Sequence, residues 1–299
     1  MLFWPIGSLV VAAEWHEPSF YRVPAGGKFR LADQNPNFKA DLKDKESAMG
    51  PLQEGVQKLA KLQDLLYADG RWGVLIVLQA IDAAGKDSTI KHVMSGVNPQ
   101  GVKVHSFKHP SSDDLRYNWL WRYNLRLPQR GEIGIFNRSY YEEVLVVKVH
   151  NLVANQCLPD SLIGPHIWRE RYEDINAFEK HLTRNGIVIL KFFLHISADE
   201  QQKRFLKRLE APEKNWKFSF SDLEERRYWN DYQGAFEKML QETSTDIAPW
   251  HCIPMNNKWF GRLIITRAIN KSLESLGLRY PPLSAEQREC LAKGKDLLA

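Results

Sequence analysis

Residues 78–91, LQAIDAAGKDSTIK, combine small residues, acids and a lysine in a way that could bind phosphate. A phosphate-binding loop reads Gly, four residues, then Gly-Lys-Ser/Thr, between a buried strand and a helix. Gly85 and Lys86 fit this pattern, but Ala80 stands at the first glycine and Asp87 at the hydroxyl residue. A helix that begins near Lys86 would present unpaired N–H groups to a phosphate, and Lys86 would add a mobile positive charge.

An extra acid, Asp82, lies inside this loop. A carboxylate repels phosphate, so its best use is to hold a divalent metal ion that bridges phosphates. The alternative is an ordinary strand–turn–helix with a capping acid, because a Gly-Lys pair is common. The residues of the predicted phosphate-binding loop are Ala83, Ala84, Gly85, Lys86, Asp87 and Ser88.

A second polar cluster lies in GIFNRSYYEEVLVVKVH, residues 134–150. Asn137 and Arg138 follow a predicted strand, at the edge where open α/β sheets bind ligands. Arg138 could clamp a phosphate with two hydrogen bonds. Glu142 and Glu143 come next, in the first turn of a predicted helix. Their simpler interpretation is favourable charge near a helix N-terminus, which we accept for Glu143.

A third cluster is basic and occupies residues 200–231. A run of charges is usually a solvated helix face, and Glu200 and Glu210 could pair with part of it. However, few acids lie between 201 and 209, so these cations suggest an external polyanion. The cations at helical spacing are Lys203, Arg204, Lys207 and Arg208, and Lys214, Lys217, Arg226 and Arg227 continue the excess.

Lys108 follows the second predicted strand at the same edge, and Arg122 lies in WLWR on the next predicted helix. We interpret Trp119 and Trp121 as core residues rather than nucleotide-stacking residues. The histidines show no metal-ligand spacing. The sequence contains no Ser-His-Asp grouping, glycine-rich dinucleotide motif or CxxC.

Short apolar runs alternate with helical patterns, which predicts a parallel sheet with helices on both faces. We expect strands at 74–80, 102–107, 132–136, 187–196 and 251–255. We expect helices at 46–68, 86–96, 112–125, 139–151, 166–185, 199–210 and 221–242. Residues 200–231 stand where a helical lid would close on a substrate. Residues 1–45 are predicted to form an irregular arm, 46–285 the catalytic domain and 286–299 a C-terminal tail.

The 299 residues carry a formal net charge of +5, which suits an anionic ligand in a local channel better than a nucleic acid. Three distant cysteines form no disulfide framework and indicate reduced thiols in the cytoplasm. The apolar start, MLFWPIGSLVVAA, lacks a basic flank and is too short and broken for a membrane span. We expect an extension there, rather than a signal peptide, and no membrane association.

The motifs together resemble the family-2 polyphosphate kinases over about residues 20–285. The segments that carry the resemblance are AIDAAGKDS (80–88), SFKHPS (106–111), WLWR (119–122), FNRSYYEEVLV (136–146), NWKF (215–218) and TSTDIAPW (243–250). The resemblance implies a P-loop kinase-like three-layer α/β sandwich with a central five-stranded parallel sheet and a helical lid. It also implies reversible phosphoryl transfer between inorganic polyphosphate and adenine nucleotides, with Mg²⁺ or alternatively Mn²⁺.

The resemblance assigns roles to individual residues. Asp82 would bind the metal, Lys86 would contact the transferred phosphoryl group, and Arg138 would be the arginine of the second motif. The basic stripe would line a polyphosphate channel through Arg204, Lys207 and Arg208. Nucleotide contacts would come from Lys108, Arg122, Asn137 and Arg138. The family's tendency to assemble implies a homo-oligomer, either a dimer or a tetramer.

The second motif also bears on the acceptor. Members that act mainly on nucleoside diphosphates often carry Asp-Arg here, with Asn four residues after the arginine. This chain has Asn137-Arg138 and Glu142, which resembles members that accept both AMP and ADP. Two other functions stay open. One is an ATP-dependent nucleoside monophosphate kinase, although its usual loop residues are missing, and the other is a non-catalytic polyphosphate-binding protein.

Overall fold

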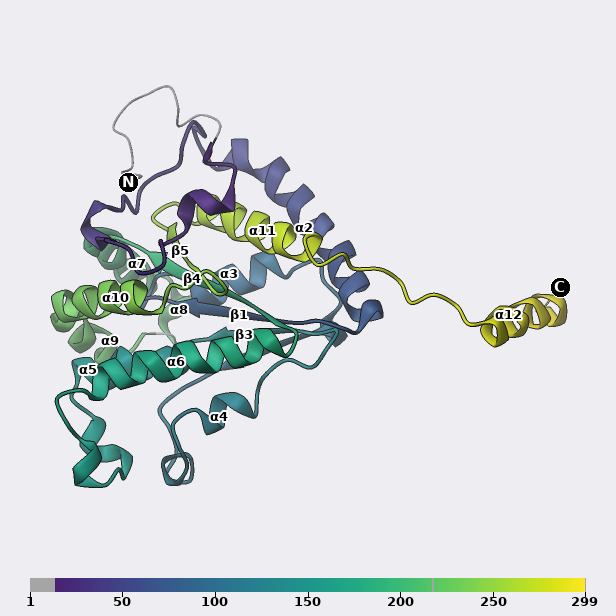
Figure 1. Cartoon of the computed structure of the whole chain (residues 1–299). Helices are drawn as coiled ribbons and strands as arrows, with labels where there is room; N and C mark the ends of the chain where they lie inside the picture. The colour runs from purple at the N-terminus through teal and green to yellow at the C-terminus, as the bar shows by residue number, and fades with distance from the viewer. Residues whose placement is uncertain (1–13, 217, 299) are drawn as a thin grey trace.

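The computed structural model describes residues 14–216 and 218–298, and these residues form a central sheet of five parallel strands (Figure 1). Every residue of β1, β3 and β5 is buried, which explains why these strands read as continuous apolar runs. The α/β class and the five-stranded parallel sheet are therefore confirmed. The strands are β1 (Gly73–Gln79), β2 (Val102–Ser106), β3 (Ile133–Asn137), β4 (Ile187–His195) and β5 (Trp250–Pro254).

The strand order is β2-β3-β1-β4-β5, so β1 lies at the centre of the sheet. Leu78 of β1 is in register with Asn137 of β3, and Gln79 is in register with Phe193 of β4. Because all strands run the same way, the segments that follow them meet at one edge. We call this the carboxyl edge. The β2–β3 side and the β4–β5 side of this edge flank the loop after β1.

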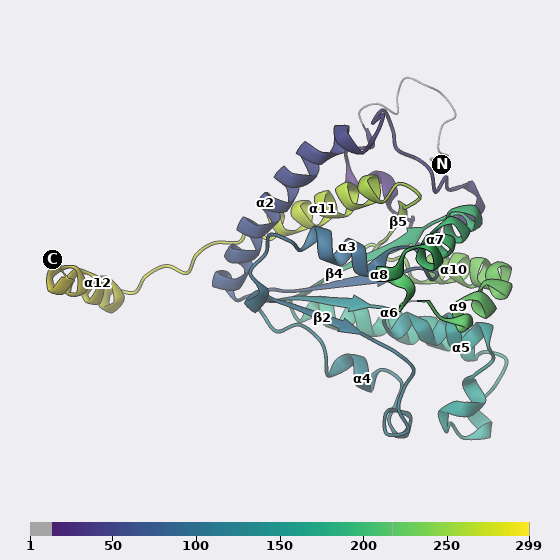
Figure 2. The same cartoon turned by 180° about the vertical axis from the view of Figure 1, so that it is seen from behind.

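Helices cover both faces of the sheet and complete three layers (Figures 1 and 2). One face packs against α2 (Lys45–Asp69), α3 (Lys86–Val93) and α11 (Lys258–Glu274), and the other against α6 (Ile167–Arg184) and α10 (Trp229–Thr243). Helix α2 begins at a capping box in which Asp44 and Ser47 exchange hydrogen bonds, and it packs along α11.

The helices beyond β4 form the lid at the carboxyl edge (Figure 1). They are α7 (Ala198–Glu210), α8 (Pro212–Asn215) and α9 (Phe220–Glu225), followed by a 3₁₀ turn at Arg226–Tyr228 and then α10. The helix predicted at 221–242 is therefore two helices joined by this turn. The other long predicted helices, at 46–68, 166–185 and 199–210, agree with α2, α6 and α7 within about two residues.

The helix predicted at 112–125 is wrong. This segment contains only a 3₁₀ turn at Asp114–Arg116 and one helical turn, α4 (Trp121–Asn124). The backbone N–H groups of Ser111 and Asp114 each donate to the other residue's side chain, and Asn118 accepts from the backbone N–H of Leu120. Such local side-chain bonds compete with helix hydrogen bonding.

The helix predicted at 139–151 is also interrupted. A 3₁₀ turn at Tyr140–Val144 precedes α5 (Val146–Val149), and Leu145 between them leaves helical geometry at φ −112° and ψ −88°. Helix α3 is shorter than its predicted range of 86–96 and ends at Val93.

The arm before α2 is irregular, with 3₁₀ turns at Pro18–Tyr21 and Leu31–Asp33. It covers the edge of β5, where the Val23 N–H donates to the Trp250 carbonyl oxygen at 2.8 Å. The apolar residues 1–13 lie outside the described part of the chain. None of the described helices is both long and apolar enough to cross a membrane.

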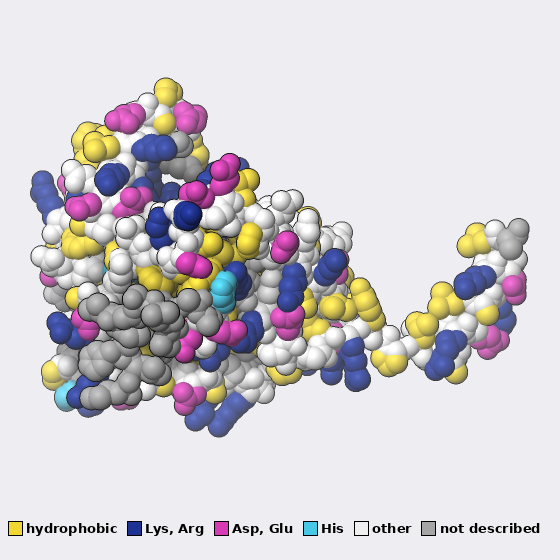
Figure 3. All heavy atoms as spheres, turned by 90° about the horizontal axis from the view of Figure 1, so that it is seen from above, with side chains coloured by type: hydrophobic (Ala, Val, Ile, Leu, Met, Phe, Trp, Pro, Cys, Tyr) yellow, Lys and Arg dark blue, Asp and Glu magenta, His cyan; other side chains and the backbone are white. Residues whose placement is uncertain are grey.

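The predicted C-terminal tail contains α12 (Ala285–Leu298), which stands clear of the body on an extended connection (Figures 1 and 3). None of its described residues is buried. In the view of Figure 3, basic and acidic side chains are interspersed over the visible face of the body.

Candidate active site

The loop after β1 has the backbone geometry of a phosphate site. Ala83 and Gly85 adopt left-handed conformations, with φ of 63° and 107°, and α3 begins directly afterwards at Lys86. Gly85 is the residue type that takes such a conformation at the least cost. The Lys86 Nζ atom donates to the Ala80 carbonyl oxygen at 2.9 Å, so the side chain folds back across the loop.

Lys86 is buried, with 9% of its surface exposed. Burial and the nearby Arg138 charge lower the pKa of Lys86 to about 8, while Asp82 and Glu142 oppose the shift. Burying the charged form of a lysine costs free energy unless an anion lies beside it. The loop therefore holds a desolvated cation ready for a phosphate.

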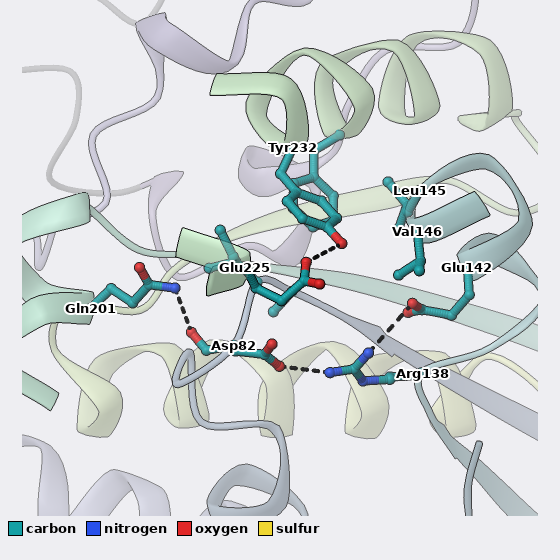
Figure 4. A pocket seen from close by; sticks show the side chains of 11 residues that line it. Asp82, Arg138, Glu142, Leu145, Val146, Gln201, Glu225 and Tyr232 are labelled. Atoms are coloured by element: carbon teal, nitrogen blue, oxygen red, sulfur yellow. Dashed lines mark hydrogen bonds and ion pairs between the residues drawn. The ribbon is translucent and has the colours of Figure 1, made fainter. Parts of the chain in front are cut away.

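Arg138 connects the loop to the end of β3 (Figure 4). Its guanidinium donates to an Asp82 carboxylate oxygen at 2.6 Å and lies 3.6 Å from a Glu142 oxygen. The Arg138 backbone is left-handed, with φ of 64°, and its N–H donates to the Leu78 carbonyl oxygen. A non-glycine residue in this conformation is strained, and such strain gathers at functional sites.

A buried ionic network lies beneath the second motif. The Tyr140 and Tyr141 hydroxyls donate to one Glu179 oxygen at 2.8 and 2.7 Å. The Lys191 Nζ atom donates to the other Glu179 oxygen at 2.6 Å and to Tyr141 at 2.9 Å. Because all four side chains are fully buried, this network fixes the segment from which Arg138 and Glu142 project.

The pocket at this edge gathers carboxylates around one guanidinium (Figure 4). Asp82 and Glu142 line it from the sheet side, and Glu225 lines it from the lid, where its carboxylate accepts from the Tyr232 hydroxyl at 2.8 Å. Burial raises the pKa of Glu142, and the charges of Arg138 and Lys86 oppose this shift. The other lining residues are Ala80, Ile81, Leu145, Val146, Gln201 and Phe236.

Asn137 joins the ends of three elements. Its side-chain amide donates to the Asp87 carboxylate at 2.7 Å and to the Ser106 hydroxyl at 3.4 Å. Asp87 is therefore held by β3 rather than standing free in the loop. A nucleotide contact by Asn137 stays a prediction, but its amide already ties α3 to the ends of β3 and β2.

A second, more open pocket lies after β2, beside Arg138's strand. Lys108 and Arg122 both line it. Their contact with a nucleotide stays a prediction. Arg122 is held firmly, since it donates to the Lys108 carbonyl oxygen at 2.6 Å and lies over the Tyr123 ring at 4.9 Å. Trp121 also lines this pocket and stacks on Tyr117, with ring centroids 4.1 Å apart.

The predicted basic stripe divides into two kinds of residue. Arg204 is buried, and its guanidinium donates to the carbonyl oxygens of Ala83 and Ala84 and pairs with Glu200 at 2.7 Å. Arg208 pairs with Asp222 of α9 at 3.1 Å, and Lys207 is exposed. Polyphosphate contacts by these residues stay predictions. The Arg204 guanidinium is already hydrogen-bonded to the loop.

Sequence reasoning missed Gln201, Glu225 and Tyr232, which line the pocket. It also singled out neither Lys258 nor Arg262 of α11. The Gln201 amide donates to the Asp82 carbonyl oxygen at 3.1 Å, which joins α7 to the loop. A signal for the α11 pair was present. Lys258 follows β5, and residues that follow parallel strands meet at the ligand-binding edge.

Comparison with known proteins adds an independent observation. A model of the family described as Polyphosphate kinase 2 matches residues 42–279. The chain is 48% identical to an ADP-polyphosphate phosphotransferase of Rhodopseudomonas palustris over 281 residues, 93% of this chain and 97% of that one. It is 46% identical to an AMP/ADP-polyphosphate phosphotransferase of Meiothermus ruber over 270 residues, 90% and 97% of the two chains.

A solved structure gives the same result. The crystal structure of polyphosphate kinase 2 from Arthrobacter aurescens superposes with a TM-score of 0.84 at 36% identity, and the match covers 92% of this chain and 96% of that one. The similarity spans the sheet, the loop and the lid together.

Proposed function

This chain belongs to the polyphosphate kinase 2 family, and we propose that it transfers a phosphoryl group reversibly from inorganic polyphosphate to AMP and ADP. The observation that carries the proposal is the constellation at the carboxyl edge. Asp82 and Arg138 are joined across the loop, with the desolvated cation Lys86 behind them. A binding protein has no evident need for an acid beside the phosphates.

The reaction is an in-line displacement. An oxygen of the nucleotide's terminal phosphate attacks the terminal phosphorus of polyphosphate. A new P–O bond forms as the bond to the next phosphate breaks, and the shortened chain leaves with that electron pair. No general base is required, because a nucleotide phosphate is already ionised near neutral pH. Positioning and charge neutralisation therefore dominate the catalysis.

Each residue of the constellation has a part in that displacement. Lys86 offsets the charge that develops on the transferred group, and the N–H groups at the start of α3 hold its oxygens. Arg138 lies on the β3 side and clamps the acceptor phosphate, once the substrate displaces its bond to Asp82. The pocket after β2, with Lys108 and Arg122, would take the rest of the nucleotide.

The carboxylates of this pocket suit a divalent metal ion that also binds the substrate phosphates. Mg²⁺ commonly uses one or two carboxylates together with substrate phosphates. Asp82 offers one carboxylate at the loop and Glu142 a second nearby, whereas no group of three or more potential ligands occurs among residues 14–216 and 218–298. We propose that Asp82 would hold Mg²⁺, or alternatively Mn²⁺, which would neutralise part of the charge of the substrate phosphates.

Two further parts of the proposal concern context. The three cysteines, Cys157, Cys252 and Cys290, are all free thiols, which favours a reducing cytoplasm. We also propose a homo-oligomer, dimer or tetramer, on the basis of the family alone. Size-exclusion chromatography with light scattering tests this part.

The deciding experiment offers AMP and ADP separately to the purified protein, with Mg²⁺, long-chain polyphosphate and no ATP. We expect ATP from ADP, and ADP followed by ATP from AMP. If ATP forms from ADP but nothing forms from AMP, polyphosphate is still the donor, but the use of both AMP and ADP as acceptors is rejected. Turnover with ATP as donor to AMP, but none with polyphosphate, would instead identify a nucleoside monophosphate kinase.

The Glu142→Asn variant examines the acceptor in the same assay. We expect it to lower kcat/KM for AMP more than for ADP, since the resemblance links Glu at this position to use of both. Polyphosphate binding without turnover of any nucleotide would leave the non-catalytic binding protein as the better description.

A further inference from the structure

We propose that Lys258 and Arg262 of α11 form a subsite for donor phosphates that lie beyond the transferred one. The inference rests on the proposed function, because it names a further part of the same donor site. It would make the two residues positioning and specificity determinants for a long polyanion.

The position of Lys258 is the first observation. A Cβ atom added to Gly85 would lie 3.2 Å from Lys258 Cε and 3.7 Å from its Cδ. The Lys258 side chain therefore lies against the phosphate loop at the start of α3. Lys258 makes no hydrogen bond or ion pair within the described part of the chain, so its three N–H donors are available to a ligand.

Arg204 holds this arrangement together. Its guanidinium donates to Ala83 and Ala84 in the loop and to the carbonyl oxygens of Met255 and Asn256 after β5. The loop and the turn that leads into α11 are thus tied by one buried side chain. This tie places Lys258, two residues after the turn, at Gly85.

The local charge is the second observation. Lys258 and Arg262 lie one helical turn apart and close to Arg204 and Arg208. The acids that face this group are Glu200 and Asp222, which pair with Arg204 and Arg208. Arg262 is half-buried, and its Nε atom is buried with no hydrogen-bond partner in the described structure. Burial and the charges of Arg204 and Arg262 together lower the pKa of Lys258 to about 8.

Such a cluster is costly without an anion, because buried or half-buried cations repel one another and lack partners. The ligand that relieves the cost must accept several hydrogen bonds and carry repeated negative charge. Phosphate groups meet both requirements.

The strand order of the sheet indicates the direction in which a bound polyphosphate would extend. Arg138 and the second pocket lie on the β2–β3 side of β1, whereas Lys258 follows β5 on the opposite side. In an in-line transfer the leaving chain points away from the acceptor. A polyphosphate whose terminal unit lies at Lys86 would therefore extend past Gly85 toward Lys258 and Arg262.

The test compares wild type with Lys258→Met, Lys258→Arg and Arg262→Met, using tripolyphosphate and long-chain polyphosphate as donors at saturating ADP. Lys271→Met is the matched control, because Lys271 lies on the same helix, is exposed and pairs with Glu17. Melting temperatures verify that each variant is folded. Calorimetric titration with long-chain polyphosphate, without nucleotide, gives binding independently of turnover.

We expect Lys258→Met to raise KM for the long chain about tenfold or more, with a smaller effect on tripolyphosphate and an unchanged KM for ADP. Lys258→Arg should recover most of the loss, and Arg262→Met should resemble Lys258→Met. An unchanged KM for the long chain, or a rise no larger than that of Lys271→Met, would overturn the subsite while the kinase function stood.

If the wild type shows no turnover with polyphosphate, the proposed function fails, and the titration still decides the subsite. Weaker polyphosphate binding by Lys258→Met than by Lys271→Met would then support an anion site. Equal binding by both variants would reject it.

Discussion

Arg138 and Asp82 face each other across the carboxyl edge, with a guanidinium nitrogen of Arg138 2.6 Å from a carboxylate oxygen of Asp82. The pair occupies the place where acceptor phosphate and metal ion are expected to meet. Substrate binding must therefore exchange one partner for another at both residues. This exchange keeps each charge compensated before and after binding, which limits the cost of burying them.

The Asp82→Asn variant should lose turnover by about a hundredfold or more, because the carboxylate that would hold the bridging cation is removed. The fold should remain, since Asp82 is partly exposed and its pair contributes little to stability. Steady-state kinetics at saturating Mg²⁺ and a thermal melt measure the two effects. Near-normal turnover would contradict the assignment of Asp82.

The rate with polyphosphate should fall as the pH rises above about 8. Burial lowers the pKa of both Lys86 and Lys258 to about 8, so each loses its positive charge above that value, while the phosphates stay ionised. The measurement is kcat/KM for polyphosphate against pH, which reports the free enzyme. Two titrating lysines should make this decline steeper than one group would.

The Lys258→Arg variant distinguishes the contributions of Lys86 and Lys258 to this pH profile, since arginine stays charged throughout this range. Its decline should be shallower and reflect Lys86 alone. A profile that stays level to about pH 10 would show that the pKa of neither lysine is lowered in the free enzyme.

Two residues of the lid should respond differently to removal of their charge. Arg204→Met should destabilise the protein by about 2–4 kcal/mol, because buried carbonyl oxygens on both sides of the tie lose their partner. Lys207→Met should leave stability unchanged, because Lys207 is exposed. Urea denaturation of both variants gives the comparison. Equal stabilities would show that the Arg204 tie contributes nothing.

The buried network beneath the second motif should be the most sensitive part of the core. Lys191→Met leaves the Glu179 charge uncompensated and should cost about 3–5 kcal/mol. The double variant Lys191→Met with Glu179→Gln should recover part of that loss, since the buried negative charge is gone. Denaturation midpoints of the single and double variants measure this coupling, and additive losses would contradict it.

Strands β1, β3 and β5 could be predicted from the sequence because a parallel strand buried on both faces is an apolar run. The run at 74–80 agrees with β1 within one residue, and the one at 251–255 agrees with β5 equally well. The helix predicted at 112–125 was wrong for a local reason. Its Ser111, Asp114 and Asn118 side chains bond to nearby backbone N–H groups, and a helical period in the apolar residues cannot reveal that competition.

The candidate site was predictable where it follows β1 and β3, since Lys86 and Arg138 lie directly after apolar runs. It was less predictable across long sequence separations. The contact of Lys258 with Gly85 depends on the strand order and on the tie through Arg204, neither of which a linear pattern contains. Glu225 and Tyr232 reach the pocket only because the lid turns at Arg226–Tyr228.

Helix α12 provides a natural attachment point. It projects from the side of the body opposite the lid (Figure 1). It also carries the exposed thiol of Cys290. Cys252 is buried, so replacing Cys157 by serine would leave Cys290 as the accessible thiol. A protein coupled to a resin through that sulfur would turn its carboxyl edge toward the solution, where an immobilised nucleotide-regenerating catalyst needs it.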